Sequence, residues 1–330
     1  MAKVHVLTGD LMAHLRILMA TYQGATFLPD QLGSFASQTH DEWSLLVSDD
    51  GSTDGTRELV ADFARSHPAR EVILIDGPRA GSAANFMHAL AQPRPAGSFV
   101  ALSDQDDIWQ SDRVARALSL LAAREGDADC QILPAVDSDA AIYASRTILM
   151  GDEGRPLGAS VLHPRGPSFG NALVQNILAG NTMVLNPAAA DLAARTAPLA
   201  IKAGVGHHDW WLYALTSGTG AQVIHDNRPG LFYRQHRGNV LGAHRSLAAA
   251  RNRWQMLRAG QYRRWLTANL AALSEIRDAL TPQAQDQLAQ LSAALKSDQI
   301  PLAQLHKSGI RRQSWRGDAV LAVSLRLQGK

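Results

Sequence analysis

The chain has 330 residues, of which 46% are hydrophobic and 19% are charged, with a formal net charge of +2 at pH 7. This composition is typical of a globular protein with a sizeable core, arranged as one large domain or two smaller ones. The small net charge gives no global field that would favour nucleic acid as a partner. The single cysteine, Cys130, excludes an intrachain disulfide framework and argues against a cysteine-based zinc site, which fits a reducing cytoplasm.

The first 22 residues contain no uninterrupted apolar run followed by a small-residue cleavage site, so we expect no signal peptide. No window approaches the roughly 18 uncharged apolar residues of a spanning helix, so we expect no membrane span. The predicted location is therefore cytoplasmic.

Strands and helices alternate four times in the first 125 residues. Apolar runs predict strands at 15–22, 43–48, 71–76 and 98–103. Helical spacing predicts helices at 26–39, 56–67, 82–92 and 112–124, with Thr53 or Asp54 as the N-cap of the second. This alternation favours an α/β fold with a parallel sheet and helices on both faces.

The second half is less regular. We expect strands at 140–150, 181–186, 221–226 and 229–236, and helices at 187–200 and 207–218. Glycine and proline predict a loop at 151–170. From about residue 246 the pattern is almost wholly helical, and it combines many arginines with three tryptophans.

Two acidic clusters follow predicted strands, where ligands of open α/β sheets bind. The first is Asp49 and Asp50, before the turn "GSTDGT". Paired carboxylates at a strand end can hydrogen-bond a ribose or a base edge. The alternative is a turn whose polar side chains only cap the next helix.

The second cluster, "SDQDD", contains Asp104, Asp106 and Asp107. Carboxylates flanking one residue suit Mg²⁺ or Mn²⁺, which can bridge to phosphate oxygens. A calcium-hand loop starting at Asp104 is excluded, because it would have Trp109 in place of Gly and Ala115 in place of Glu. The alternative is a capped helix start at 111–112 with solvated acids, and Asp107 either orients its neighbours or opens that helix.

Asp209 lies in "GVGHHDWWLYAL", at the start of a predicted helix. The helix dipole alone would favour a carboxylate there. It would instead be a general base if the fold carries it to the substrate. His207 and His208 are expected to be solvent-facing or packing residues. His236, in "YRQHRGN", is either a structural histidine or a third metal ligand.

The segment "GPSFG" (166–170) matches the nucleophile elbow G-x-S-x-G of serine hydrolases. Ser168, Asp209 and His236 even occur in the hydrolase chain order. No convincing strand precedes Ser168, and Pro164 and Pro167 crowd it, so a serine hydrolase is a remote alternative.

Seven segments in one order resemble family 2 glycosyltransferases, most closely the bacterial rhamnosyltransferase-like members, over about residues 15–243. They are "ILMATYQGATFLPDQLGSFASQT", "SLLVSDDGSTDGT", "GSAANFMHAL", "ALSDQDDIW", "AGNTMVLN", "HHDWWLYAL" and "YRQHRGNVLG". The resemblance implies a GT-A fold and an inverting, metal-dependent hexosyltransferase with a nucleotide-sugar donor and Mn²⁺ or Mg²⁺. The catalytic domain would span residues 1–243, with its nucleotide-binding half at about 15–107 and its acceptor half at 108–243.

The resemblance also assigns roles to residues. On the donor side it implies Thr21, Tyr22, Asp49, Asp50, Asn85 and Asp104. On the acceptor side it implies Gly180, with His208 and Trp210 from the "HDWW" segment. Asp209 matches the catalytic base, and Asp104, Asp106 and His236 match the metal ligands. His208 stands where many relatives have Glu, which leaves the acceptor role of that Glu open here.

The donor that the subgroup suggests is dTDP-L-rhamnose, with UDP- or GDP-sugars as the alternatives. The implied acceptor is a surface-polysaccharide or lipopolysaccharide glycan, free or lipid-linked. Residues 244–330 form a predicted helical extension. Its arginines and tryptophans suit peripheral contact with an anionic membrane. The alternative is packing on the catalytic domain or on a second subunit of a homodimer. A nucleotide-sugar-binding protein or scaffold without transfer activity is the other functional alternative.

Overall fold

The computed structural model describes residues 13–124, 126–151, 153–235, 259–296 and 302–326. The first part alternates strands and helices, as predicted, in the order β1 (Leu15–Thr21), α1 (Leu28–Ala36), β2 (Trp43–Asp49), α2 (Thr56–Ser66), β3 (Val72–Asp76), α3 (Ser82–Leu90) and β4 (Phe99–Ser103). The middle part comprises β5 (Ile108–Trp109), α4 (Arg113–Ala123), β6 (Cys130–Leu133), β7 (Ala141–Met150), β8 (Pro156–Ala159), α5 (Phe169–Ala172), the 3₁₀ turn η2 (Gly180–Thr182), β9 (Val184–Leu185), α6 (Pro187–Lys202), α7 (His208–Gly218) and β10 (Gln222–Arg234). The C-terminal part comprises α9 (Gln261–Glu275), η3 (Arg277–Ala279), α10 (Pro282–Lys296), α11 (Leu302–Lys307) and α12 (Trp315–Arg326).

The strands form one mixed sheet in the order β3-β2-β1-β4-β9-β7-β10-β5, with β6 joined to β10 and β8 to β7. The longer ladders, β1 with β2 and β4, β2 with β3, and β7 with β10, are parallel. The antiparallel ladders are short, such as β4 with β9 and β10 with β5. The predicted mixed, mostly parallel sheet is therefore confirmed.

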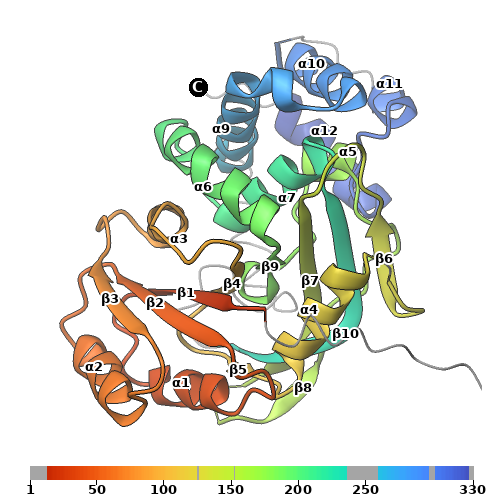
Figure 1. Ribbon diagram of the computed structural model, residues 1–330. Helices are drawn as coiled ribbons and strands as arrows, with labels where there is room; N and C mark the ends of the chain where they lie inside the picture. Colours follow the sequence, from red (N-terminus) through yellow and green to blue (C-terminus); the bar gives the residue numbers. More distant parts are fainter. Residues whose placement is uncertain (1–12, 125, 152, 236–258, 297–301, 327–330) are drawn as a thin grey trace, which may run out of the picture.

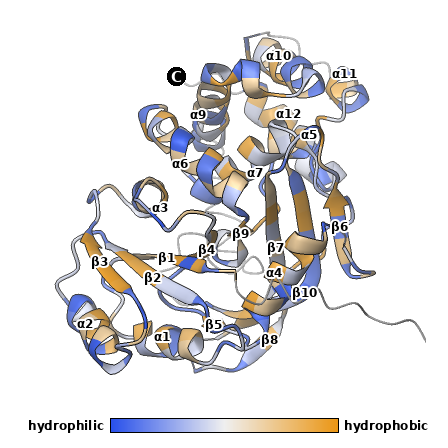
Figure 2. Cartoon of the chain, in the orientation of Figure 1, coloured by the Kyte–Doolittle hydropathy of each residue, from blue (hydrophilic) through white to orange (hydrophobic). Residues whose placement is uncertain are grey.

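Two hydrophobic cores lie on opposite faces of this sheet, because side chains alternate along each strand. In β1, Leu18 joins the core beneath α3, α6 and α7, whereas Ile17 and Met19 join the core beneath α1, α2 and α4. Figure 1 shows α1 and α2 on one side of β1–β3 and α3 on the other, and Figure 2 shows the apolar strands between them. Helices on both faces are thus confirmed.

The C-terminal helices pack on the rest of the chain. Leu266 and Leu273 of α9, Leu288 of α10 and Leu321 of α12 belong to the same core as α6 and α7. Figure 1 shows this group together at the top of the molecule, above α6, α7 and α5. The predicted helical extension is confirmed for the described residues, and none of the helices described has the length and apolar character needed to span a bilayer.

Three local predictions were wrong. The N-cap of α2 is Gly55, with φ of +93°, rather than Thr53 or Asp54. Residues 151–170 contain β8 and the start of α5 as well as loop. The strands predicted at 221–226 and 229–236 are one strand, β10, whose pairing with β7 shifts register on either side of Pro229. Proline has no N–H for the ladder, so the strand is irregular there without ending.

Candidate active site

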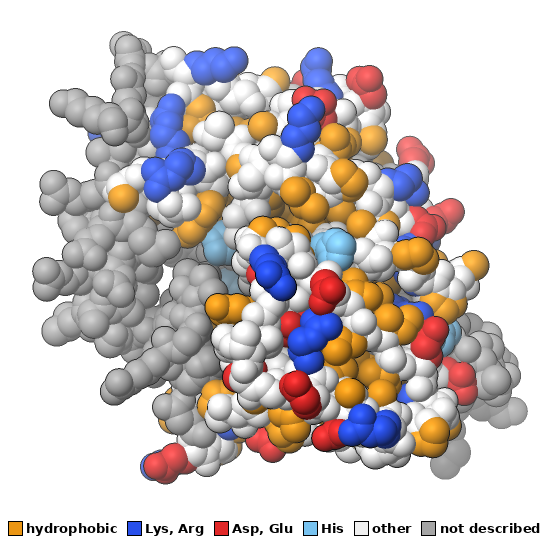
Figure 3. All heavy atoms as spheres, turned by 90° about the vertical axis from the view of Figure 1, so that its left-hand side faces the viewer, with side chains coloured by type: hydrophobic (Ala, Val, Ile, Leu, Met, Phe, Trp, Pro, Cys, Tyr) orange, Lys and Arg blue, Asp and Glu red, His pale blue; other side chains and the backbone are white. Residues whose placement is uncertain are grey.

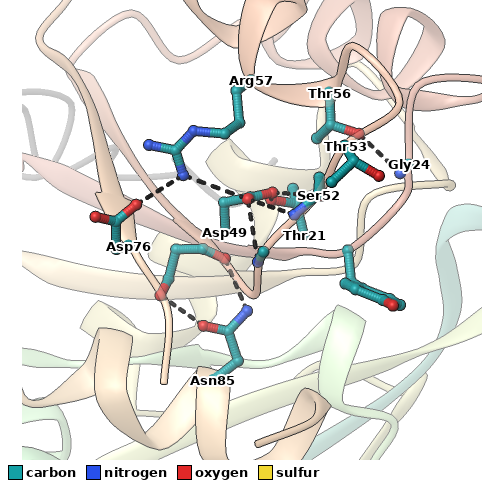
Figure 4. Close-up of polar contacts among 12 residues, drawn as sticks. Thr21, Gly24, Asp49, Ser52, Thr53, Thr56, Arg57, Asp76 and Asn85 are labelled. Carbon is teal, nitrogen blue, oxygen red and sulfur yellow. Dashed lines mark hydrogen bonds and ion pairs between the residues drawn. The ribbon is translucent and has the colours of Figure 1, made fainter. Parts of the chain in front are cut away.

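The turn after β2 is organised by Asp49. Its two carboxylate oxygens accept from Thr21 Oγ1 (2.8 Å), the Ser52 N–H (2.9 Å), Ser52 Oγ (2.6 Å) and Arg57 (3.3 Å). Burial alone would raise the pKa of Asp49, but the hydrogen bonds from Ser52 and Thr21 outweigh it and hold the pKa below its usual value. Asp49 is therefore a buried anion whose oxygens are already occupied by protein donors (Figure 4).

Asp50 differs from Asp49 because one of its carboxylate oxygens accepts no hydrogen bond from the described residues. Its Oδ2 accepts the Gly81 N–H at 2.8 Å, whereas its Oδ1 is buried and has no hydrogen-bond partner among the described residues. A buried carboxylate oxygen without a donor is costly. Of the two acids, Asp50 is the one with a free acceptor for a ligand hydroxyl or N–H.

Asn85 ties helix α3 to strand β2. Its Nδ2 donates to the Ser48 carbonyl (2.7 Å), and its Oδ1 accepts from Ser48 Oγ (2.5 Å). Asn85 is buried, so it positions the end of β2 from within the fold. Its side chain is bound to Ser48, so any donor-side role of Asn85 would be indirect, through the position of β2.

The loop after β1 is hydrogen-bonded to the turn after β2. The Gly24 N–H donates to Thr56 Oγ1 (2.8 Å), and the Ala25 N–H donates to Asp54 Oδ2 (3.0 Å). Figure 4 shows Thr21 and Gly24 facing Ser52, Thr53 and Thr56 across these contacts. These hydrogen bonds fix the backbone of the loop that follows β1. Tyr22, at the start of this loop, is 58% exposed.

Strand β4 delivers the second acidic cluster. Asp104, Asp106 and Asp107 each offer a carboxylate oxygen within 4.8 Å of the others. Burial, followed by the charges of Asp106 and Asp209, raises the pKa of Asp104 to about 8. Hard oxygen donors at this density, destabilised as anions by one another, fit Mg²⁺ or Mn²⁺. The residues present thus suit the cation that the sequence predicts.

Asp107 is the buried support of this cluster and does not open helix α4, which begins after Asp112. Its carboxylate accepts from Asn181 Nδ2 (2.6 Å) and from the Arg234 N–H (3.3 Å). The Arg113 guanidinium in turn donates to the Asn181 carbonyl (2.9 Å). Burial and the charges of the neighbouring acids raise the pKa of Asp107 well above its usual value.

Gln105, between the two predicted ligands, fixes the acidic loop to the first strand. Its Oε1 accepts the Tyr22 N–H (2.9 Å), and its Nε2 donates to the Tyr22 carbonyl (3.0 Å). Gly24 leaves the space for this side chain, since a Cβ there would lie 2.2 Å from Gln105 Oε1. The sequence reasoning missed Gln105, because the middle residue of D-x-D carries no signal of its own.

Arg234, at the end of β10, is a second residue that the sequence reasoning missed. Its Nε donates to the Asp106 carbonyl (3.1 Å), and its guanidinium pairs with Asp30 of α1 (2.8 Å). It therefore links the acidic loop to α1. His236, the predicted third metal ligand, lies outside the described residues, and that prediction is untested.

Asp209 lies in the first turn of α7, which begins at His208, and its charge contributes to the raised pKa of Asp104. Gly180 packs directly against this helix start. A Cβ on Gly180 would lie 2.6 Å from His208 Nε2 and 3.0 Å from Asp209 Cβ. The fold thus brings together two acids that are more than one hundred residues apart in sequence, with Gly180 beside them.

His208 and Trp210 flank Asp209 from within the fold. His208 stacks on Phe86 at 3.9 Å, and burial lowers its pKa to about 4, so it is neutral at pH 7. Its Nε2 has no hydrogen-bond partner among the described residues. Trp210 is buried and donates from Nε1 to the Ala172 carbonyl (2.6 Å). Both are packing residues here, and their acceptor-side role stays a prediction.

Ser168 has a structural role. Its side chain caps α5 by accepting the Asn171 N–H (3.2 Å), and β8 ends at Ala159, so no strand leads directly into it. A nucleophile elbow requires a strand-to-helix turn. The match of "GPSFG" to the hydrolase pattern is therefore coincidental.

On the face drawn in Figure 3, the described basic and acidic side chains are interspersed. They are not gathered there into a patch of one sign.

The comparisons with known proteins agree with this arrangement. The family model "Glycosyl transferase family 2" matches residues 16–183, from β1 through the acidic cluster to η2. The chain belongs to this family. It is accordingly a glycosyltransferase of the class that uses nucleotide-sugar donors, and the sheet described above is its GT-A fold.

Two curated relatives are informative. The chain is 26% identical over 272 residues to the dTDP-rhamnosyl transferase RfbG of Shigella flexneri, covering 78% of this chain and 85% of the relative. It is 24% identical over 170 residues to the putative teichuronic acid biosynthesis glycosyltransferase TuaG of Bacillus subtilis, covering 52% of this chain and 61% of the relative.

Among solved structures, S. aureus TarS 1–349 in complex with UDP-GlcNAc matches with a TM-score of 0.48 and 14% identity, covering 95% of this chain and 90% of that one. The mannosyltransferase PcManGT of Pyrobaculum calidifontis, in complex with GDP-Man and Mn²⁺, matches with a TM-score of 0.45 and 17% identity, covering 94% and 85%.

Proposed function

We propose that this protein is an inverting, metal-dependent glycosyltransferase that moves L-rhamnose from dTDP-L-rhamnose to a glycan acceptor. The observation that carries the proposal is that η2 contacts both groups: Gly180 packs against Asp209, and Asn181, next to it, donates to Asp107 of the acidic cluster. A base beside the group that binds the donor diphosphate is what a single displacement requires. The choice of rhamnose is supported by the similarity to RfbG.

On the donor side, the free Oδ1 of Asp50 would accept a hydrogen bond from the base or the ribose, and the exposed Tyr22 would pack against the base. Asp49 and Asn85 would act indirectly, by fixing the turn and the strand end that present these groups. Asp104 and Asp106 would hold Mn²⁺ or Mg²⁺, with His236 as the proposed third ligand. The bound cation would supply charge stabilisation to the leaving diphosphate.

On the acceptor side, Asp209 would remove the proton of the attacking hydroxyl. The acceptor oxygen then bonds to the anomeric carbon, and the bond from that carbon to the diphosphate oxygen breaks with its electron pair. No covalent enzyme intermediate is needed. Gly180 keeps the approach to Asp209 open, because any side chain there would collide with His208.

The acceptor that we propose is a surface-polysaccharide or lipopolysaccharide glycan, with a cytoplasmic location. Peripheral membrane contact through α12 would bring a lipid-linked acceptor to the protein. The exposed face of this helix carries Trp315 (74% exposed), Val320 and Val323, with Arg316 beside Trp315. Exposed aromatic and aliphatic side chains flanked by arginine are typical of interfacial helices.

The test is a panel of dTDP-, UDP- and GDP-sugars, assayed for thermal stabilisation with Mn²⁺ and then for donor turnover. We expect the largest stabilisation with dTDP-L-rhamnose and slow hydrolysis of that donor without acceptor. Stabilisation by UDP- or GDP-sugars alone would refute the rhamnose assignment. Donor binding with no turnover, with or without glycan acceptors, would favour the binding-protein alternative.

A further inference from the structure

A cavity of about 210 Å³ lies where residues 165–171 meet residues 311–313, the segment that leads into α12. Its lining includes Arg165, Ser168, Asn171, Arg311 and Gln313. None of these residues belongs to the site around Asp104. Figure 1 shows α5 next to α12 at this junction between the sheet and the C-terminal helices.

Hydrogen bonds between the two segments hold the wall of the cavity in place. Asn171 Nδ2 donates to the Arg311 carbonyl (3.0 Å), and the Arg165 N–H donates to Gln313 Oε1 (2.9 Å). Directly beside it, Gly170 meets Gly309 so closely that a Cβ on Gly170 would lie 2.4 Å from the Gly309 carbonyl oxygen. The two segments are therefore held in register without a ligand.

The side-chain amide of Gln313, which lines the cavity, keeps a hydrogen-bond donor without a partner among the described residues. Because Gln313 Oε1 accepts from Arg165, the position of Nε2 is fixed. Gln313 is 7% exposed, and its Nε2 has no hydrogen-bond partner among the described residues. A buried N–H group without an acceptor is destabilising, and an acceptor entering the cavity would remove that cost.

The charged groups of the cavity are cations. Arg165 and Arg311 line it, and neither forms an ion pair with a carboxylate among the described residues. The acid of this segment, Asp318, is engaged elsewhere, by the Arg312 N–H (2.7 Å) and by His306 (3.4 Å). The Arg165 guanidinium donates from Nη1 to the Arg312 carbonyl. Its remaining N–H groups, the guanidinium of Arg311 and the free amide donor of Gln313 match the oxygens of a phosphate group.

We propose that this cavity binds a phosphate group of a ligand other than the sugar donor. The phosphate would belong either to a lipid headgroup or to a soluble phosphorylated compound, and both present the same oxygens. The proposal does not rest on the sugar or the metal assigned above, since it uses none of their residues.

Calorimetry of the full chain with inorganic pyrophosphate, in EDTA, tests the site without contribution from a bound divalent cation. We expect saturable binding to the wild-type protein and about tenfold weaker binding to Arg311→Ala, equivalent to about 1.4 kcal/mol. Gln313→Glu keeps the acceptor for Arg165 but puts a carboxylate in place of the donor, so binding should be lost. Arg155→Ala removes an exposed arginine elsewhere and should bind like the wild type.

Absence of binding to the wild-type protein, or equal binding by Arg311→Ala and Arg155→Ala, would overturn the proposal. If Gln313→Glu has a lowered Tm, Arg311→Ala decides alone, because Arg311 is exposed. Asp106→Ala should keep pyrophosphate binding in EDTA even where it loses the donor, which separates this site from the proposed active site.

Cosedimentation identifies the source of the phosphate. Vesicles of phosphatidic acid that bind the wild type better than Arg311→Ala, and are displaced by pyrophosphate, would indicate a lipid headgroup. Pyrophosphate binding without such vesicle binding would indicate a soluble ligand. Vesicle binding that is equal in both variants and insensitive to pyrophosphate refutes the lipid source for this cavity.

Discussion

The side-chain amide of Gln105 makes both hydrogen bonds that the peptide groups of Tyr22 offer, as a donor at 3.0 Å and an acceptor at 2.9 Å. The acidic loop after β4 is thereby fastened to the end of β1, its parallel neighbour in the sheet. The positions of the proposed metal ligands on either side of Gln105 therefore depend on the end of β1, to which the amide is bound.

Gly24→Ala should disrupt this fastening. The new Cβ would lie 2.2 Å from Gln105 Oε1, so we expect a loss of about 1–3 kcal/mol in unfolding free energy, as for overpacking, together with weaker donor binding. Urea unfolding and donor titration would measure both effects. Gly33→Ala is the matched control, because nothing lies within 4 Å of its Cβ and alanine favours the interior of α1. Equal behaviour of the two variants would contradict the prediction.

Removal of the cation, or of one of its ligands, should weaken donor binding. With Asp106→Ala or with EDTA, we expect at least about a tenfold loss of donor affinity, because the diphosphate charge would no longer be neutralised. Calorimetry with and without Mn²⁺ measures this. Asp278→Ala, an exposed acid in η3, should leave the affinity unchanged. Unchanged Mn²⁺-dependent affinity in Asp106→Ala would remove it from the ligand set.

Asp209→Asn tests the general base. The amide has almost the same shape but cannot accept the hydroxyl proton, so we expect about a 10²- to 10⁴-fold loss of transfer rate with donor affinity retained. Turnover numbers and donor titration separate the two quantities. Asp191→Asn, an exposed acid of α6 paired with Arg94, serves as the control and should transfer normally. Wild-type turnover in Asp209→Asn would refute the assignment.

Gly180→Ala tests the contact between η2 and the start of α7. The Cβ would meet His208 Nε2 at 2.6 Å and Asp209 Cβ at 3.0 Å, so one of the two segments must move. We expect a fall in kcat of about 10²-fold, the usual effect of an ångström-scale displacement of a catalytic group. The KM for the donor should be measured as well, because Asn181, next to Gly180, donates to Asp107 of the acidic cluster. A normal kcat would show that the contact relaxes without moving Asp209.

The buried histidines His208 and His225 should contribute less to stability in acid than at neutral pH. Burial lowers the pKa of His208 from 6.5 to about 4, and that of His225 to about 4 as well. Between these pH values each of these two histidines binds more protons in the unfolded chain than in the folded one, so its contribution to stability falls as the pH falls from 6.5 toward 4. The raised pKa values of Asp104 and Asp107 act in the opposite direction, so the histidine contribution is read from the difference between a histidine variant and the wild type. His208→Gln should reduce this loss by about 3 kcal/mol. Urea unfolding at pH 7 and pH 4.5 measures the difference, and an unchanged pH dependence would contradict it.

The sequence predicts best the elements whose pattern is local. The apolar runs of β1, β2 and β4 and the helical spacing of α2 and α4 contain enough residues to define a period. The strands β5, β6 and β8 are two to four residues long and exist because a neighbouring strand pairs with them. Such tertiary pairing leaves no periodic signal in a short segment.

For the site, acids at strand ends are visible in the sequence, but their surroundings are not. Asp49 and Asp50 look equivalent in "DDGSTDGT", yet one is saturated by protein donors and the other keeps a free oxygen. Asp107 looks like a helix opener, but it is buried against Asn181 and Arg234. These differences depend on residues far apart in sequence, which only the fold brings together.

The contact between Asp107 and the Arg234 N–H joins residues 127 positions apart, and β5 pairs with the last part of β10. During synthesis the acidic loop therefore emerges long before the strand that supports it. The first βα units can form while the ribosome is still translating the second half, but the acidic loop gains its support from Arg234 only after β10 has been released. An N-terminal fragment that ends anywhere from residue 107 to residue 233 contains all three acids of the cluster without the support of Arg234.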